Sequence, residues 1–184
     1  MPNESTIIVP VPEAEPLLGC LRGRHDRVAA LGVPAHITLL YPFLPPSRAL
    51  NEQNELQRFF DNMGPFEFSL IEVRRFPATL YLHPNEAGKF KTITSLLSTK
   101  WPTCKPYNGA FADVVPHLTV ADKVDVATMD TVEPSIRPHL PIRCTATEAW
   151  LMCSDDQDRW TRRACYHFAN GRSPSPSPAL ELSL

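Results

Sequence analysis

The stretch "PAHITLL" at residues 34–40 combines a β-strand pattern with two polar side chains that a buried strand does not need. Its β-branched and leucine residues favour a strand. In a strand, side chains two positions apart project from the same face. His36 and Thr38 therefore stand side by side, with Ile37 and Leu39 on the opposite face. This strand presents an imidazole and a hydroxyl group in one direction.

The same pattern returns in "PHLTV" at residues 116–120, which places His117 and Thr119 on a second strand. In both motifs the histidine follows shortly after a proline. The sequence contains six histidines, so a single His-x-Thr match carries a high false-positive risk. Two matches in corresponding halves of the chain are much harder to obtain by chance. They predict an internal duplication in which two imidazoles and two hydroxyls converge in one cleft.

This set of side chains suits the opening of a phosphodiester. One imidazole can take a proton from water while the other gives a proton to the leaving oxygen, because the ordinary pKa of histidine lies near neutral pH. Each threonine hydroxyl can donate to a non-bridging phosphate oxygen and stabilise its negative charge. No third histidine, cysteine or carboxylate lies at metal-ligand spacing beside these motifs, so we expect catalysis that needs no metal and no cofactor.

Short strands interleaved with a few helices predict an α+β fold, and few of the connections suit a purely parallel sheet. The apolar periodicity predicts the elements. Strands are expected over 5–12, 33–46, 66–76, 79–84, 114–124, 142–154 and 159–169, and helices over 13–26, 47–64, 85–101 and 125–137. The last two strands are expected to form a terminal hairpin.

Residues 1–170 are expected to form one domain with two pseudo-symmetric lobes. Residues 171–184 repeat Ser-Pro and carry too little apolar surface to offset the entropy of ordering. We therefore expect a disordered tail after residue 170.

The net charge of −2 and the pI of about 6.3 argue against a dedicated binder of long nucleic acid. A nucleotide or an RNA end remains compatible with them. The five cysteines form no C-x-x-C pair and are interpreted as reduced thiols. Neither a signal peptide nor a membrane-spanning run is expected. We expect a cytoplasmic or nucleocytoplasmic monomer.

The segments "IIVPVPEAEPLLGCLRGRHD" (7–26) and "GVPAHITLLYPF" (32–43), together with the second motif, resemble the 2′-5′ RNA ligase-like branch of the 2H phosphoesterase superfamily. The resemblance covers about residues 5–169. It implies a two-lobed duplicated fold, with antiparallel sheets flanked by helices around a central cleft. It also implies that the catalytic residues are the four motif residues, His36, Thr38, His117 and Thr119, and that they work without a metal.

Members of this superfamily act on 2′,3′-cyclic phosphates, 2′-5′ linkages or related nucleotide phosphodiesters. The resemblance therefore implies a metal-independent phosphodiesterase whose substrate is a nucleotide or an RNA end. Two alternatives stay open: a ligase that joins RNA ends through a 2′-5′ linkage, and a nucleotide-binding module without catalysis. The sequence does not decide which histidine is the acid and which is the base.

Two further residues are candidates for substrate binding. Tyr41 follows the first motif and is a candidate to stack on a nucleobase at the mouth of the cleft. Strand alternation would place Tyr41 on the face of Ile37, away from His36, unless the "YPF" segment turns the chain. Lys123 follows the second motif on the face of Thr119 and is a candidate to hold a phosphate. A solvated surface position is the alternative for this lysine.

Overall fold

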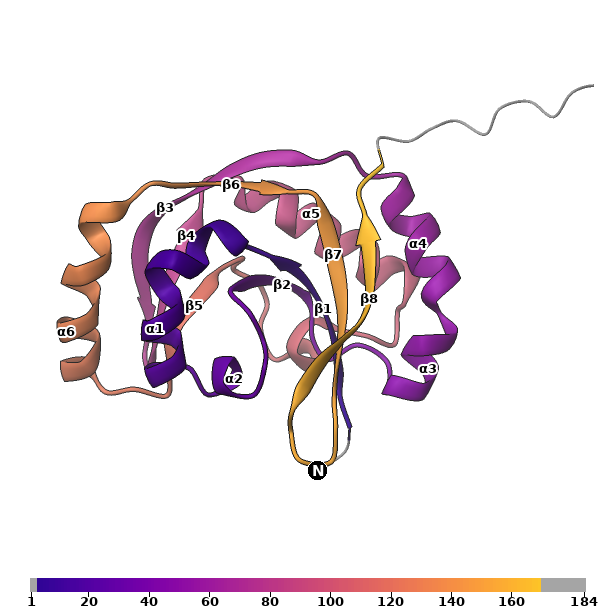
Figure 1. Cartoon of the computed structure of the whole chain (residues 1–184). Coiled ribbons are helices and arrows are strands. Elements are labelled where there is room, and N and C mark those ends of the chain that lie inside the picture. The colour runs from indigo at the N-terminus through magenta and orange to yellow at the C-terminus, as the bar shows by residue number, and fades with distance from the viewer. Residues whose placement is uncertain (1–2, 170–184) are drawn as a thin grey trace, which may run out of the picture.

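The computed structural model describes residues 3–169, which form two four-stranded sheets surrounded by helices (Figure 1). One sheet has the strand order β2-β1-β7-β8 and the other has the order β5-β4-β3-β6. Within the described residues every strand pair in both sheets is antiparallel. The predicted α+β fold with antiparallel sheets is confirmed.

The elements follow one another along the chain in a fixed order. The strands are β1 (Ser5–Pro10), β2 (His36–Leu40), β3 (Phe66–Phe76), β4 (Thr79–Pro84), β5 (Leu118–Asp122), β6 (Ile142–Ala146), β7 (Glu148–Ser154) and β8 (Trp160–His167). The helices are α1 (Glu15–His25), α2 (Arg27–Ala30), α3 (Pro46–Asn51), α4 (Gln53–Asp61), α5 (Ala87–Lys100) and α6 (Val126–Ile136). Short 3₁₀ turns cover Pro12–Ala14, Pro106–Gly109 and Arg137–His139.

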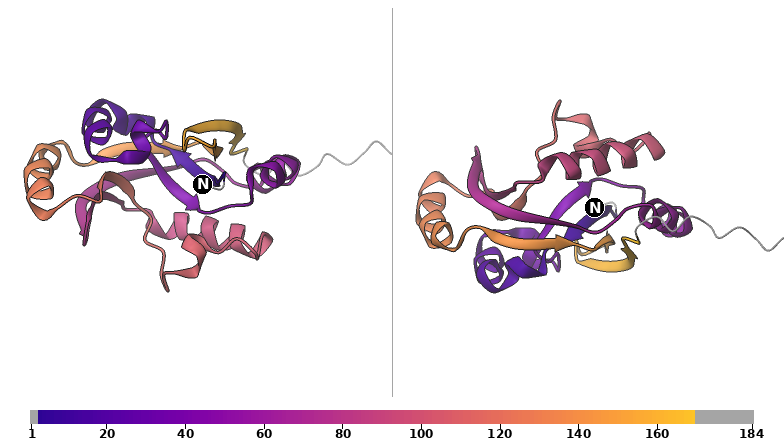
Figure 2. Two further views of the ribbon diagram at one scale, coloured as in Figure 1. Left: turned by 90° about the horizontal axis from the view of Figure 1, so that it is seen from below. Right: turned by 90° about the horizontal axis from the view of Figure 1, so that it is seen from above.

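The two halves repeat one unit, in which a strand, a helix and a second strand follow one another. The first unit is β1-α1-β2 and the second is β4-α5-β5, and in each unit the two strands pair with each other. The helix of each unit packs on a strand of the other unit: α1 packs on β5, and α5 packs on β2. Figure 2 shows α1 and α5 on opposite sides of the strands. The repeat agrees with the duplication that the two motifs predict.

The core lies between the sheets and the helices, and aromatic rings fill much of one end. The α4 helix turns Leu56 and Phe60 inward, and both are fully buried. The ring of Phe60 stacks on Tyr166 and on Phe168, with ring centroids 5.6 Å apart in each pair. The C-terminal strand is thereby anchored against a helix from the middle of the chain.

Two predicted elements are each divided into two in the structure. The single helix predicted over 47–64 is wrong, since α3 and α4 are separate helices that meet at Glu52. The single strand predicted over 142–154 is also divided, at Thr147. Its first part, β6, pairs with β3, and its second part, β7, pairs with β1 and β8 in the other sheet. One extended segment thus belongs to both sheets.

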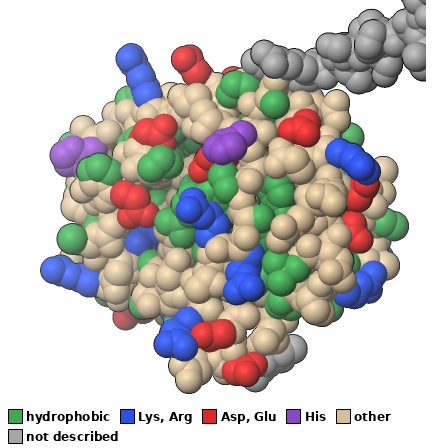
Figure 3. Space-filling view, turned by 45° about the vertical axis from the view of Figure 1, so that its right-hand side comes forward, with side chains coloured by type: hydrophobic (Ala, Val, Ile, Leu, Met, Phe, Trp, Pro, Cys, Tyr) green, Lys and Arg blue, Asp and Glu red, His purple; other side chains and the backbone are tan. Residues whose placement is uncertain are grey.

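The surface carries charges of both signs. Figure 3 shows acidic and basic side chains interspersed on one face, with hydrophobic side chains in small groups between them. No helix within residues 3–169 is both long and apolar enough to cross a lipid bilayer. The Ser-Pro tail predicted over 171–184 lies outside the described residues, and the monomeric state and the cytoplasmic location stay predictions.

Candidate active site

The two motif strands meet at the centre of the molecule. Each is the edge strand of its own sheet, and β2 contacts β5 across the boundary between the sheets. A cleft of about 740 Å³ opens there, and His36, Thr38, His117 and Thr119 all line it. The fold therefore brings the four motif residues together, as the paired motifs predict, although His36 and His117 are far apart in the sequence.

The two imidazoles are held in the same way. The Nδ1 atom of His36 lies 2.7 Å from the carbonyl oxygen of Pro34, and Nδ1 of His117 lies 2.7 Å from that of Val115. A carbonyl oxygen only accepts hydrogen bonds, so each Nδ1 must carry a proton and donate it. This assigns the tautomer of both neutral rings and leaves each Nε2 as the nitrogen that can take up or release a proton.

The two histidines differ in their electrostatic surroundings. Burial, and then the positive charge of Arg22, lower the pKa of His36 to about 4, and the nearby His117 acts in the same direction. Burial also lowers the pKa of His117, but the carbonyl oxygen of Val115 and the carboxylate of Asp122 oppose this effect. Burial therefore favours the neutral form of both rings, and His117 differs from His36 in having an anion nearby that opposes this effect.

A buried ion pair lies behind the cleft. Arg22 on α1 is only 2% exposed, and its Nη2 atom lies 2.8 Å from Oδ2 of Asp26, one turn along the chain. The Nε atom of Arg22 donates to the backbone carbonyl oxygen of Thr119 at 3.0 Å. Asp26 lines the cleft and caps α2 by accepting from the backbone nitrogen of Val28 at 3.2 Å. Neither Arg22 nor Asp26 was predicted from the sequence to belong to the site, although their i, i+4 spacing on a predicted helix is a signal for such a pair.

Tyr41 belongs to the cleft lining, together with Tyr107, Phe111 and Trp160. Strand β2 ends at Leu40, so the alternation that would turn Tyr41 away from His36 does not extend to it. The rings of Tyr107 and Trp160 both meet Tyr41 edge-on, with centroids 6.4 Å apart. The hydroxyl of Tyr41 donates to Oε2 of Glu4 at 2.7 Å. An aromatic wall thus forms one side of the cleft.

No local pattern in the sequence places Tyr107, Phe111 or Trp160 beside Tyr41. Tyr107 sits on an irregular turn with a positive φ of 50°, and its backbone nitrogen donates to the carbonyl oxygen of Tyr41 at 2.6 Å. Burial raises the pKa of Tyr107, whereas the side chain of Thr38 acts in the opposite direction. Phe111 is 62% exposed, which is unusual for so large an apolar side chain.

Lys123 also lines the cleft. It follows the last residue of β5 and has a positive φ of 56°, so its position comes from a turn rather than from strand alternation. The preceding residue, Asp122, accepts a hydrogen bond from the hydroxyl of Thr79 at 2.8 Å. The side of the cleft next to the second motif is therefore polar and contains charges of both signs.

Known families supply a comparison for this geometry. The family model for the 2′-5′ RNA ligase superfamily matches residues 10–158. The chain belongs to the 2′-5′ RNA ligase superfamily. A search of curated proteins finds no match. The matched residues include both His-x-Thr motifs and both strands that carry them.

Solved structures share the fold of this superfamily member at low sequence identity. Escherichia coli LigT in complex with 3′-AMP matches with a TM-score of 0.57 and 14% identity, covering 91% of this chain and 99% of LigT. LigT in complex with NADP+ matches with a TM-score of 0.60 and 15% identity, covering 91% and 98%. The TT0787 protein of Thermus thermophilus matches with a TM-score of 0.61 and 14% identity, covering 92% and 100%. These likenesses establish the two-sheet fold over nearly all of the chain.

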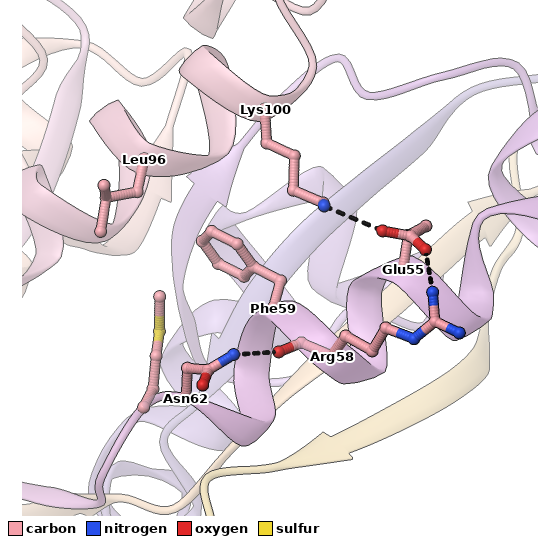
Figure 4. Close-up of a pocket in the computed structure, with 7 residues that line it drawn as sticks. Glu55, Arg58, Phe59, Asn62, Leu96 and Lys100 are labelled. Carbon is pink, nitrogen blue, oxygen red and sulfur yellow. Dashed lines mark hydrogen bonds and ion pairs between the residues drawn. The ribbon is translucent and has the colours of Figure 1, made fainter. Parts of the chain in front are cut away.

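A second, smaller hollow of about 370 Å³ lies between α4 and α5, away from the two His-x-Thr motifs (Figure 4). Glu55 crosses it, accepting from Lys100 at 2.9 Å and from Arg58. Phe59 and Leu96 supply its apolar surface. Among the described residues no imidazole lines this hollow, and its charged side chains pair with one another. The central cleft is therefore the better candidate for the active site.

Proposed function

We propose that the central cleft catalyses the hydrolysis of a nucleotide phosphodiester, either a 2′,3′-cyclic phosphate or a 2′-5′ linkage, by general acid and base catalysis with two histidines. The observation that carries the proposal is the matched anchoring of His36 and His117. Both rings donate from Nδ1 to a backbone carbonyl oxygen at 2.7 Å. Both therefore offer Nε2 to the same cleft.

The electrostatic difference between the rings supports a division of roles between them. His36, with its pKa lowered to about 4, is neutral near pH 7 and acts as the base. Its Nε2 takes a proton from water as the water oxygen bonds to phosphorus. Burial lowers the pKa of His117 and the carboxylate of Asp122 partly opposes this effect, so His117 is the ring proposed to act as the acid in its protonated form. Its Nε2 gives a proton to the ribose oxygen as the bond between that oxygen and phosphorus breaks. The product is a phosphomonoester with a free ribose hydroxyl.

The threonines and Lys123 are proposed to hold the phosphate. The hydroxyls of Thr38 and Thr119 donate to the non-bridging oxygens, where negative charge increases in the transition state. Lys123 lines the same cleft and supplies a positive charge that attracts the phosphate. In this proposal the side chains of the cleft supply the proton transfers and the charge stabilisation.

The aromatic wall is proposed to receive the nucleobase. Tyr41 lies between Tyr107 and Trp160, and a base can stack on such rings with little dependence on its sequence. The structures of LigT with 3′-AMP and with NADP+ support a nucleotide as the ligand. The wall forms one side of the cleft, so the base and the phosphate have separate sites.

The test is hydrolysis of a panel of nucleoside 2′,3′-cyclic phosphates in the presence of EDTA. Wild-type protein is compared with the His36→Ala/His117→Ala double variant, and with His139→Ala as a control on an exposed histidine. We expect turnover by wild type and by the control, and none by the double variant. The product isomer then shows which ribose oxygen leaves.

Two parallel incubations distinguish the alternatives. A 2′-5′ linked dinucleotide tests cleavage of that linkage, and an RNA with a 2′,3′-cyclic phosphate end plus a 5′-hydroxyl RNA tests joining. Joining without hydrolysis would assign the ligase reaction instead. Binding of 3′-AMP with no turnover of any substrate would assign a binding module, and equal turnover by the double variant would exclude the two-histidine mechanism.

A further inference from the structure

We propose that Glu148, Cys165 and His167 form a zinc-binding site on the hairpin of β7 and β8, separate from the central cleft. None of these residues lines the cleft. The prediction that no metal is needed concerned only the residues beside the two motifs. Here the ligands come from two strands whose register places them together, so spacing along the sequence does not reveal them.

The register of the hairpin builds the site. Glu148 lies directly opposite His167, and Trp150 lies directly opposite Cys165. Cys165 and His167 are two positions apart on one strand, so their side chains share a face. Because opposite residues and i, i+2 residues are both neighbours on this face, the three ligands form a compact group at one end of the hairpin.

The distances suit a shared ion. Nδ1 of His167 lies 3.1 Å from Oε2 of Glu148, and Nε2 of His167 lies 4.0 Å from the Sγ atom of Cys165. One ligand atom from each residue can be chosen so that all three lie within 4.8 Å of one another. Ligand bonds to zinc are about 2.0–2.3 Å long, so three donors at these separations can reach one ion after small side-chain rotations.

A neighbouring side chain already orients the carboxylate. The indole Nε1 of Trp150 donates to Oε1 of Glu148 at 2.6 Å, which leaves Oε2 for an ion. The guanidinium of Arg162 lies over the indole ring, 4.5 Å from its centroid, and restricts it. Hydrogen bonds of this kind hold metal ligands in place in known sites, and their loss weakens metal binding.

The donor set favours zinc. It combines a thiol sulfur, an imidazole nitrogen and a carboxylate oxygen, all of which are common zinc ligands, and three protein ligands leave the fourth tetrahedral position for water. The thiol loses its proton to the solvent when the sulfur–zinc bond forms. One thiolate and one carboxylate then balance the two positive charges of the ion.

Solvent can reach the site from one side. The side chain of His167 is 76% exposed, that of Glu148 is 22% exposed, and Cys165 is partly buried. Of the other four cysteines, Cys104, Cys144 and Cys153 are buried and Cys20 is exposed. Since β8 is an edge strand of its sheet, an ion that joins it to β7 would stabilise the end of the hairpin.

The experiment measures metal binding directly. The parent is the full chain with Cys20→Ser, which leaves Cys165 as the one thiol that is not buried, and with His36→Ala and His117→Ala, which removes the imidazoles of the cleft. Cobalt(II) is titrated first, because a cobalt–thiolate bond produces a charge-transfer absorption band. Zinc is then added to displace the cobalt. We expect one ion per chain and protection of Cys165 from a thiol reagent by zinc.

Single variants of the parent test each ligand. Cys165→Ser should abolish the absorption band, and Glu148→Gln and His167→Gln should weaken binding about tenfold or more. His139→Gln, at another exposed histidine, should leave binding unchanged. Zinc should also raise the midpoint of thermal unfolding of the parent but not of Cys165→Ser. Absence of the band in the parent, or unchanged affinity in His167→Gln, would overturn the proposal. Protection of Cys165 by zinc is measured on the parent, so this test does not depend on the folding of any ligand variant.

Discussion

The guanidinium of Arg22 donates from Nε to the backbone carbonyl oxygen of Thr119 at 3.0 Å, so a buried cation on α1 is bonded to the strand of the second motif. The other half of the molecule has a counterpart without charge. There the hydroxyl of Thr94 on α5 donates to the carbonyl oxygen of Leu39 at 2.8 Å. The strand-helix-strand unit is present in both halves, but only one of these two contacts between a helix and the motif strand of the other half involves a charge. This difference is one physical source of the unequal electrostatic surroundings of two similar histidines.

Removing either histidine should remove most of the activity. His36→Ala and His117→Ala are each expected to lower kcat about 10²- to 10⁴-fold, because each deletes one proton-transfer step. The measurement is steady-state hydrolysis of the best 2′,3′-cyclic phosphate, with folding checked by circular dichroism. His139→Ala serves as the control. Near wild-type turnover in both single variants would contradict the assigned chemistry.

The threonines should matter less than the histidines. Thr38→Val and Thr119→Val keep the β-branched shape of the strand and delete one hydrogen bond to a charged oxygen. Such a bond is worth about 1.5–3 kcal/mol, so kcat/KM should fall roughly tenfold to a hundredfold. Each variant is assayed beside wild type on the same substrate. A loss as large as that of the histidine variants would mean that threonine does more than stabilise charge.

The charge of Arg22, together with the larger effect of burial, should set the acid side of the pH profile. In the Arg22→Met/Asp26→Asn double variant the cation near His36 is gone and no lone buried carboxylate is left behind. Loss of a positive neighbour favours the protonated ring, so the pKa of His36 rises from about 4. Because the base must be neutral, the acid limb of kcat/KM should move to higher pH.

Thr94→Val is the matched control for that shift. It removes the hydrogen bond from α5 to the carbonyl oxygen of Leu39 on the first motif strand. It does not change any charge. Its stability should fall, while its acid limb should stay at the wild-type pH. If Arg22→Met/Asp26→Asn and Thr94→Val moved the acid limb equally, the packing of α1 and α5 on the motif strands would explain the effect. The charge of Arg22 would then not be its cause.

Asp122 should influence the other side of the profile. Its carboxylate raises the pKa of His117, against the larger effect of burial. Asp122→Asn keeps an oxygen that can accept from Thr79 and removes the negative charge. The pKa of His117 then falls, so less of the acid is protonated at a given pH and the alkaline limb of kcat/KM should move to lower pH. A shift of the acid limb instead would reverse the assigned roles of His36 and His117.

The aromatic cluster around α4 should contribute strongly to stability. Phe60 is fully buried and stacks on Tyr166 and Phe168. Phe60→Ala should lower the free energy of unfolding by about 3–5 kcal/mol, as measured by chemical denaturation. Phe111→Ala, at a ring that is 62% exposed, should change it by about 0.5 kcal/mol or less.

Local patterns explain which parts of the fold were predictable. The strands predicted over 66–76 and 79–84 agree with the bounds of β3 and β4, because alternation is a property of neighbouring residues. The division of 142–154 at Thr147 was not predictable in this way. It depends on pairing with β3 in one sheet and with β1 and β8 in the other, and β1 and β3 are distant in the sequence.

The sequence by itself determined which side chains are candidates for catalysis, because the two His-x-Thr motifs are short patterns on strands whose alternation turns each pair to one face. Only the tertiary structure decided how these groups lie relative to one another. It placed β2 against β5, bonded Arg22 to a strand 97 residues away and brought Tyr107 beside Tyr41. Such contacts follow from the packing of whole helices and sheets, to which no local pattern responds. The physical difference between the two histidines, from which their separate roles are proposed, is a property of that packing.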